Sequence, residues 1–378
     1  LGTEHAKIMF ATRDFTCGSE PPAVAIEVRT TDTAVDVVAG KYSVCAALAS
    51  GRVVCWGAND YGQLGDGTLN PSSKPVTVKG IEDAVSLIST TLYTCALRKS
   101  GKVSCWGKNE YGEFGTTAIT ESSVPVDVPG IEDAVELAGS LHSSCARNAA
   151  GEVRCWGLEF AGGLGRGASR RVTPTPTLVP LPGPVVRLSA SVTAMCAMTE
   201  AGGAHCWGSI FGDVPPGPFA VNSVPNIAFI RILQAGLFVA DKSGDVWCAG
   251  PNDLGICGTG TTEEVSRLTK VPALKSIRDL DGLLASACAV RNDGSSLCWG
   301  INSEGSLGVG KTEREQPLVL NPTEIVGVPT AKKVSVGDTT NCLVSMDGRV
   351  FCAGLNGDGQ LGDGTNTKAA SFVRVQNL

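Results

Sequence analysis

One hairpin occurs seven times along this chain, and in six of its copies two cysteines stand ten positions apart. A glycine lies four residues before each second cysteine, and Trp-Gly or Ala-Gly follows it. In the remaining copy Phe238 and Cys248 hold the matching positions. Self-similarity with a period of about 50 residues is typical of a solenoid or a propeller, so the repeat limits the fold more than any local motif does. The six pairs are Cys45 with Cys55, Cys95 with Cys105, Cys145 with Cys155, Cys196 with Cys206, Cys288 with Cys298, and Cys342 with Cys352.

The second copy of the repeat is the clearest to interpret. Residues 83–88 alternate apolar and polar side chains, as a half-buried strand does. Residues 93–97 and 102–106 form a hairpin about Gly101, which supplies the positive φ that a three-residue loop with a bulge needs. Its two cysteines then face each other with Cα atoms ~4.5–5.5 Å apart, a separation that a disulfide tolerates. The spacing predicts a cross-strand disulfide and not a zinc site, which needs closer ligand pairs.

A glycine-rich loop follows the hairpin, seen at residues 59–68 and again at 356–365, and a short strand such as 74–78 comes next. Proline in that strand suits an outer, edge-lying position. Each unit is therefore a four-stranded antiparallel sheet, and seven such units close into a ring of blades. The sequence predicts an all-β, seven-bladed β-propeller over residues 34–378, preceded by an N-terminal arm at residues 1–33.

The repeat also resembles a known family. The order of strand, hairpin, Trp-Gly-x-Asn and Tyr-Gly-Gln-Leu-Gly-x-Gly is similar to the regulator of chromosome condensation repeat, over roughly residues 31–378. The resemblance implies a seven-bladed propeller. It implies function only broadly, because the family includes a nucleotide exchange factor for a small GTPase, a plant ultraviolet-B photoreceptor and bacterial β-lactamase inhibitors. The cysteine-bearing hairpin is similar to that of secreted bacterial members.

The cysteine count indicates the compartment. Twelve of the fifteen cysteines form the matched pairs, which favours an oxidising, secreted or cell-surface location. Cys257 takes the place of Leu64 in the glycine-rich loop, beside the hairpin that carries Phe238, so we expect Cys248 to pair with Cys257. Cys17 is then left over. An intermolecular link, a partner in sequence missing from this chain and a free thiol all stay open for it.

The composition argues against several function classes. The net charge is −6 and basic residues cluster only at 166–171, which argues against nucleic acid as a partner. No apolar stretch approaches 18 residues, so we expect no membrane span, and the absence of a signal peptide at Leu1 indicates a mature or trimmed product. The three histidines, His5, His142 and His205, are too few for a hydrolytic triad. We therefore expect no enzyme activity, cofactor or metal.

Two further motifs have a structural interpretation. The loop at 356–365 has a calcium-like series of oxygen donors, but it lacks the bidentate glutamate of a helix–loop–helix site and recurs at 59–68. Five tryptophans hold the strand position after a cysteine, which favours packing over a chromophore cluster. His142 occupies a turn, where a hydrogen bond to the backbone is the expected role. The five tryptophans are Trp56, Trp106, Trp156, Trp207 and Trp299.

The copies differ most in the loops after the Trp-Gly strand, and loops on a rigid scaffold are where binding is expected. Binding and neutral drift both stay open for them. The candidate binding residues are Arg170, Arg171, Asp213, Lys311 and Arg314.

These observations favour a secreted or cell-surface binding, adhesion or assembly module with a protein or a surface polymer as partner. The alternatives are a propeller-type enzyme inhibitor, by fold analogy, and a GTPase-exchange-like factor. In the N-terminal arm, residues 24–28 are expected either to pair beside residues 372–375 and close the ring, or to project with Cys17 into a neighbouring subunit.

Overall fold

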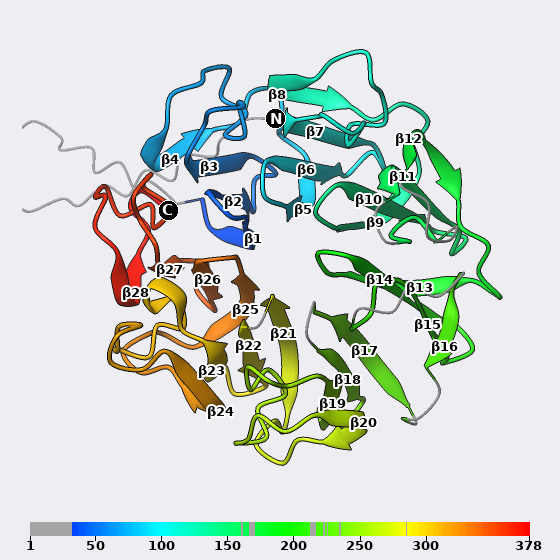
Figure 1. Cartoon of the computed structure of the whole chain (residues 1–378). Helices are drawn as coiled ribbons and strands as arrows, with labels where there is room; N and C mark the ends of the chain where they lie inside the picture. Colours follow the sequence, from blue (N-terminus) through cyan, green and yellow to red (C-terminus); the bar gives the residue numbers. More distant parts are fainter. Residues whose placement is uncertain are drawn as a thin grey trace, which may run out of the picture.

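The computed structural model arranges the chain as a ring of seven blades around a central channel (Figure 1). It describes residues 32–159, 162–165, 171–211, 217–221, 224, 226–233, 236–284 and 286–378. Each blade is an antiparallel sheet of four consecutive strands, ordered from the channel outward. The predicted fold class, an all-β seven-bladed propeller, is confirmed.

The strand bounds follow the repeat closely. The innermost strands are β1 (Ala34–Ala39), β5 (Ala84–Ser89), β9 (Ala134–Gly139), β13 (Val185–Ala190), β17 (Ile227–Ile232), β21 (Ile277–Leu283) and β25 (Ala331–Val336). The second strands are β2 (Ser43–Leu48), β6 (Tyr93–Arg98), β10 (Ser143–Asn148), β14 (Ala194–Thr199), β18 (Leu237–Asp241), β22 (Ser286–Arg291) and β26 (Thr340–Ser345). The third strands are β3 (Val53–Gly57), β7 (Val103–Lys108), β11 (Val153–Glu159), β15 (Ala204–Gly208), β19 (Val246–Gly250), β23 (Ser296–Ile301) and β27 (Val350–Gly354). The outer strands are β4 (Ser72–Thr77), β8 (Glu121–Asp127), β12 (Arg171–Leu178), β16 (Phe219–Val221), β20 (Val265–Lys270), β24 (Leu318–Glu324) and β28 (Ala369–Arg374).

This strand order gives the disc two different faces. Loops that join first to second strands and third to fourth strands emerge on one side, which we call the loop face. The hairpins between second and third strands and the connections between blades emerge on the other side, the hairpin face. At the hairpin glycine Gly101 φ is +86°, and an added Cβ would lie 2.6 Å from the carbonyl oxygen of Glu132. Glycine is needed there both for its conformation and for the close approach of the next connection.

The hairpins carry the disulfides. Cys95 and Cys105 are opposed in the register of β6 and β7, and the structure joins them with a Cα–Cα distance of 4.0 Å. Five equivalent hairpins are joined in the same way at 4.0–4.1 Å, which is closer than the separation expected from strand geometry alone. Their bridges are Cys45 with Cys55, Cys145 with Cys155, Cys196 with Cys206, Cys288 with Cys298, and Cys342 with Cys352.

The fifth blade departs from this pattern. Phe238 faces Cys248 in the register of β18 and β19, so the usual cross-strand bridge has no second cysteine there. Cys248 is bonded instead to Cys257 of the following glycine-rich loop, at a Cα–Cα distance of 5.5 Å. The bridge in this blade therefore joins a strand to a loop, whereas the other six join two strands.

Tryptophans fasten neighbouring blades together. Trp106 is fully buried, and its indole Nε1 donates a hydrogen bond of 2.9 Å to the carbonyl oxygen of Gln63, which lies in the glycine-rich loop of the preceding blade. A buried indole N–H needs such an acceptor. Five of the seven junctions repeat this bond, with Trp56, Trp106, Trp156, Trp207 and Trp299 donating to Gln360, Gln63, Glu113, Gly163 and Ile256.

An asparagine shapes the glycine-rich loop in five blades, and Glu159 accepts the equivalent bond from the Leu164 N–H in the third. The Asn59 side-chain oxygen accepts from the Leu64 N–H at 2.9 Å, while its amide donates to the Thr68 and Asn70 carbonyls at 3.1 and 3.0 Å. Asp66 accepts from the Thr68 N–H at 2.9 Å. Side-chain oxygens that gave this loop its calcium-like appearance are thus engaged in holding the loop itself.

The junction between the last and first blades uses the same kinds of contact. Trp56 donates to Gln360 at 2.8 Å, and the Ala39 N–H donates to Ser335 Oγ at 3.0 Å. The described strands of the last blade, β25 to β28, are consecutive. The expected pairing of residues 24–28 beside residues 372–375 falls outside the described residues.

Candidate functional site

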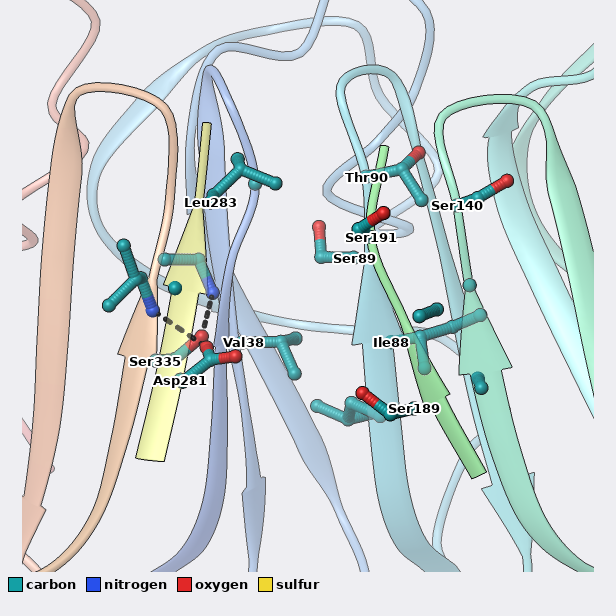
Figure 2. Close-up of a pocket in the computed structure, with 18 of the residues that line it drawn as sticks. Val38, Ile88, Ser89, Thr90, Ser140, Ser189, Ser191, Asp281, Leu283 and Ser335 are labelled. Carbon is teal, nitrogen blue, oxygen red and sulfur yellow. Dashed lines mark hydrogen bonds between the residues drawn. The ribbon is translucent and has the colours of Figure 1, made fainter. Parts of the chain in front are cut away.

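The central channel holds a cavity of about 540 Å³. Its wall is formed by residues of all seven innermost strands and of the turns that follow several of them. This volume lies within the ~300–1,000 Å³ typical of small-molecule sites in proteins. Figure 2 shows side chains from separate blades pointing into the same space. The channel is therefore the candidate site that the fold itself creates.

Successive side chains of a strand point to opposite sides, so alternate residues of each innermost strand belong to one wall. At the equivalent of Val38 the residues of the first three blades are apolar, and those of the other four are polar. The positions in chain order are Val38, Ile88, Ala138, Ser189, Arg231, Asp281 and Ser335. At this level of the channel, one side is therefore apolar and the other is polar.

Carboxylates two residues earlier tie three of the blades to the blade that follows. Asp36 accepts a hydrogen bond of 3.0 Å from the Leu87 N–H, and Glu136 accepts one of 3.1 Å from the Leu188 N–H. Asp279 does the same for the blade that follows it, accepting from a backbone N–H at 3.0 Å. These bonds pair backbone donors that face the channel, where an unmade bond would be costly.

The same carboxylates have cationic partners. Lys333 is paired with Asp36, and the Arg147 Nε lies 2.8 Å from Glu136. Burial lowers the pKa of Lys333, but the Asp36 carboxylate outweighs that effect and the pKa is raised overall. The Lys333–Asp36 pair joins the last blade to the first, whereas Arg147 and Glu136 are opposed within the third blade.

Asp281 differs from the other wall carboxylates. It accepts a hydrogen bond of 2.9 Å from the Val336 N–H. Burial raises the pKa of its carboxyl group, because removal from water disfavours the charged form. The Val336 bond and the positive charge of Arg231 oppose that rise without cancelling it.

Hydroxyl groups gather toward the loop-face end of the channel. Figure 2 shows Thr90, Ser140 and Ser191 on neighbouring blades at this level. Lys41 and Asp338 form an ion pair of 3.1 Å at the same end. The hydrogen bond to Asp338 raises the pKa of Lys41. Polar donors therefore line the loop-face entrance of the channel.

The loop residues selected from the sequence do not form one site. Lys311 and Arg314 are exposed in the loop between β23 and β24 on the loop face. Arg171 is exposed at the start of β12, three blades away from that loop. Arg170, Asp213 and Cys17 lie outside the described residues.

The histidines also lie apart. His142 Nδ1 is 3.4 Å from the buried carboxylate of Glu113, and its ring packs edge-on against Tyr111 at 4.6 Å between centroids. The expected role of a turn residue bonded to the backbone is thus replaced by contacts with two side chains. His205 lies in β15 opposite Ala197, and His5 is outside the described residues.

Sequence reasoning did not single out any residue of the channel. The signal that could have found them is the contrast between repeats. Aligned on their cysteines, the innermost strands keep small or apolar residues at buried positions but carry a different side chain at each channel position, such as Asp36, Ser86 and Glu136.

Within the described residues, no helix has the length and apolar character that crossing a membrane requires.

Comparison with known proteins agrees with the fold. The regulator of chromosome condensation (RCC1) repeat model matches residues 34–63, 93–113 and 331–360, and a second model of the same description matches residues 50–96. Protein pim1 of Schizosaccharomyces pombe is 25% identical over 236 residues, covering 54% of this chain and 43% of pim1. The chain spans less than half the length of the first curated relatives it matches.

Two solved structures illustrate the range of the fold. Prp20p of Saccharomyces cerevisiae, described with its binding to Gsp1p and histones, has a TM-score of 0.75 at 20% identity, covering 92% of this chain and 87% of its own. The ectodomain of the Arabidopsis thaliana receptor kinase ACR4 has a TM-score of 0.52 at 17% identity, covering 89% and 98%. At these identities the likeness concerns the fold alone.

Proposed function

Because this chain is built from repeats of the regulator of chromosome condensation (RCC1) family, we propose that it is a non-catalytic binding module of an oxidising, extracytoplasmic compartment. In this proposal it is secreted or displayed at the cell surface. There it serves adhesion or assembly by contacting a protein or a surface polymer through the loops of one face.

The observation that carries the proposal is the set of seven disulfides within the described chain. Disulfides of this density persist where the surroundings are oxidising and are rare in reducing compartments. The ACR4 ectodomain also supports an extracytoplasmic location, since it is an ectodomain with a similar propeller.

The loop face supports a binding role. Each blade is locked by its disulfide and most junctions by a tryptophan, so the loops between third and fourth strands extend from a rigid disc. Those loops differ between blades, and Lys311 and Arg314 are exposed in one of them. Rigid presentation lowers the ordering cost of binding.

The first test concerns the compartment. Intact cells of the native source are treated with a membrane-impermeant thiol reagent and then a permeant one, and the disulfides are mapped by mass spectrometry without reduction. Seven internal bridges on protein outside the cytoplasmic fraction support the proposal. Reduced cysteines on cytoplasmic protein would exclude it and favour the exchange-factor alternative.

The second test concerns the binding face. Retention of the purified chain on cells of its source is compared with that of a double variant, Lys311→Ala with Arg314→Ala. The matched control, Lys99→Ala with Lys242→Ala, removes two exposed cations from hairpins of the opposite face. We expect the loop-face pair to weaken retention and the control to leave it unchanged. Equal retention of all three proteins would remove the third-to-fourth-strand loop of the sixth blade from the proposed contact surface.

A further inference from the structure

One arginine of the channel wall has no anionic partner among the described residues. Of the four described cations that line the cavity, Lys41, Arg231 and Lys333 each lie within ion-pair distance of a wall carboxylate. Arg187 is exposed to the cavity, and no hydrogen bond or ion pair joins its side chain to another described residue. Its guanidinium donors are therefore free to bind an anion from solution.

A second donor lies beside it on the same strand. Ser189 stands two residues after Arg187 on β13, so both side chains belong to the channel side. The Ser189 hydroxyl oxygen accepts a hydrogen bond of 3.1 Å from the Ile232 N–H. Its own hydrogen is not donated to any described residue. A group that accepts from both Arg187 and Ser189 would satisfy both.

The wall carboxylates leave this donor pair available. Glu136, on the adjacent blade, accepts from the Leu188 N–H and from Arg147, and Asp279 accepts from a backbone N–H. Each of these carboxylates already has a cationic partner, Arg147 for Glu136 and Arg231 for Asp279. Arg187 is thus not neutralised from its own wall.

The apolar side of the cavity completes the site. Val38 and Ile88 are half-buried and point into the channel from the first two blades (Figure 2). An apolar group placed against them would lose contact with water, which is favourable in proportion to the area buried. Sites of this volume are usually mostly apolar with a few oriented polar groups.

We propose that the central channel binds a small amphipathic organic anion, whose oxyanion accepts hydrogen bonds from Arg187 and Ser189 while its apolar body packs on Val38 and Ile88. The site is independent of the loop face, so this inference does not rest on the proposed protein or polymer contact.

The test uses two matched dyes on the full chain. Anilinonaphthalene sulfonate has an aromatic body and an anionic group, and phenylnaphthylamine has the same body without the charge. Arg187→Met keeps a long side chain but removes the guanidinium. We expect this variant to bind anilinonaphthalene sulfonate at least about tenfold more weakly, because a charged hydrogen bond is lost. Its affinity for phenylnaphthylamine should fall by less than about twofold. Octanoate should displace the sulfonate from the unaltered chain.

Two further variants locate the site. Arg278→Met removes an exposed arginine on β21 that does not line the cavity, and should leave both affinities unchanged. Thr90→Trp narrows the entrance and should weaken both dyes. The proposal is overturned if Arg187→Met leaves sulfonate affinity unchanged, if Arg278→Met lowers it equally, or if Thr90→Trp affects neither dye.

Discussion

The outer blade junctions conserve the same residues from one repeat to the next, whereas the channel wall does not. At the junctions the same residues recur, so that Trp106 bonds to the loop of the blade before it just as Trp56 does across the closure of the ring. Along the channel, equivalent positions carry different side chains, such as Asp36, Glu136 and Arg187. The junctions therefore repeat the contacts that specify the fold, whereas the wall residues vary from blade to blade even where, as at Asp36 and Glu136, they also bond to the next blade.

Removing the tryptophan of an outer junction should lower the free energy of unfolding more than any other change predicted below. Trp106→Ala removes a fully buried side chain and leaves the Gln63 carbonyl without its donor. We expect the free energy of unfolding to fall by about 3–5 kcal/mol. Urea unfolding followed by circular dichroism measures it. The control is Trp247→Ala, which removes a half-buried indole that lies over Lys270 and makes no hydrogen bond to another described blade. Equal losses would contradict the special role of the junction.

The glycine-rich loop gives the next test. An added Cβ on Gly62 would lie 2.4 Å from the Ser123 Cα of the next blade, whereas Gly80, with a similar positive φ, has nothing within 4 Å. Gly80→Ala should cost about 1 kcal/mol for the left-handed conformation alone. Gly62→Ala should cost at least about 2–3 kcal/mol, because backbone of the next blade must also move. Similar losses in urea unfolding would mean that the loop can withdraw from its neighbour without penalty.

The fifth blade allows the disulfide to be moved. In the double variant Phe238→Cys with Cys257→Leu, positions 238 and 248 are opposed, and the loop regains the leucine found at Leu64. We expect a bridge between positions 238 and 248 on mass-spectrometric mapping. Stability should fall by about 2–3 kcal/mol, since the Phe238 ring that contacts Trp299 is lost. A free thiol at position 248 would show that the fifth blade has departed from the shared hairpin geometry.

Replacing a carboxylate of the channel should change the free energy of unfolding least, and it should raise it rather than lower it. Burial raises the pKa of Asp281 above its unfolded value, so the folded chain holds this proton more tightly. The contribution of this carboxyl group to folding stability is favourable below its unfolded pKa of about 3.9. It is lost as the pH rises through the folded pKa. Asp281→Asn carries no charge and should raise stability at neutral pH by about 1 kcal/mol, with the gain vanishing in acid. A variant less stable at neutral pH would show that the charged form is favoured by its surroundings.

Much of the fold was predictable because its signals are local. The hairpin register that opposes Cys95 and Cys105 depends on ten residues and one glycine, and proline in the outer strand indicates an edge. Even the pair of Cys248 and Cys257, nine residues apart, follows from comparing one repeat with the others. The role of the tryptophans in packing was also visible, but the carbonyl that each indole meets was not.

The candidate site was not predictable in the same way. His142 looked like a simple turn residue until the fold placed Glu113 and Tyr111 beside it. Arg187 looked like any exposed arginine, and its lack of a described partner depends on how Glu136 and its neighbours are paired.

The blade follows from local sequence signals, because strand alternation, turn glycines and the paired cysteines act over a few residues and are repeated along the chain. The channel forms only when the chain has folded, since its contacts join residues far apart, as in the bond between Ser335 and Ala39 across 296 positions. Ring closure brings side chains from seven separate blades onto the channel wall. Whether a charge there is paired or free depends on the neighbouring blade, which no single repeat encodes.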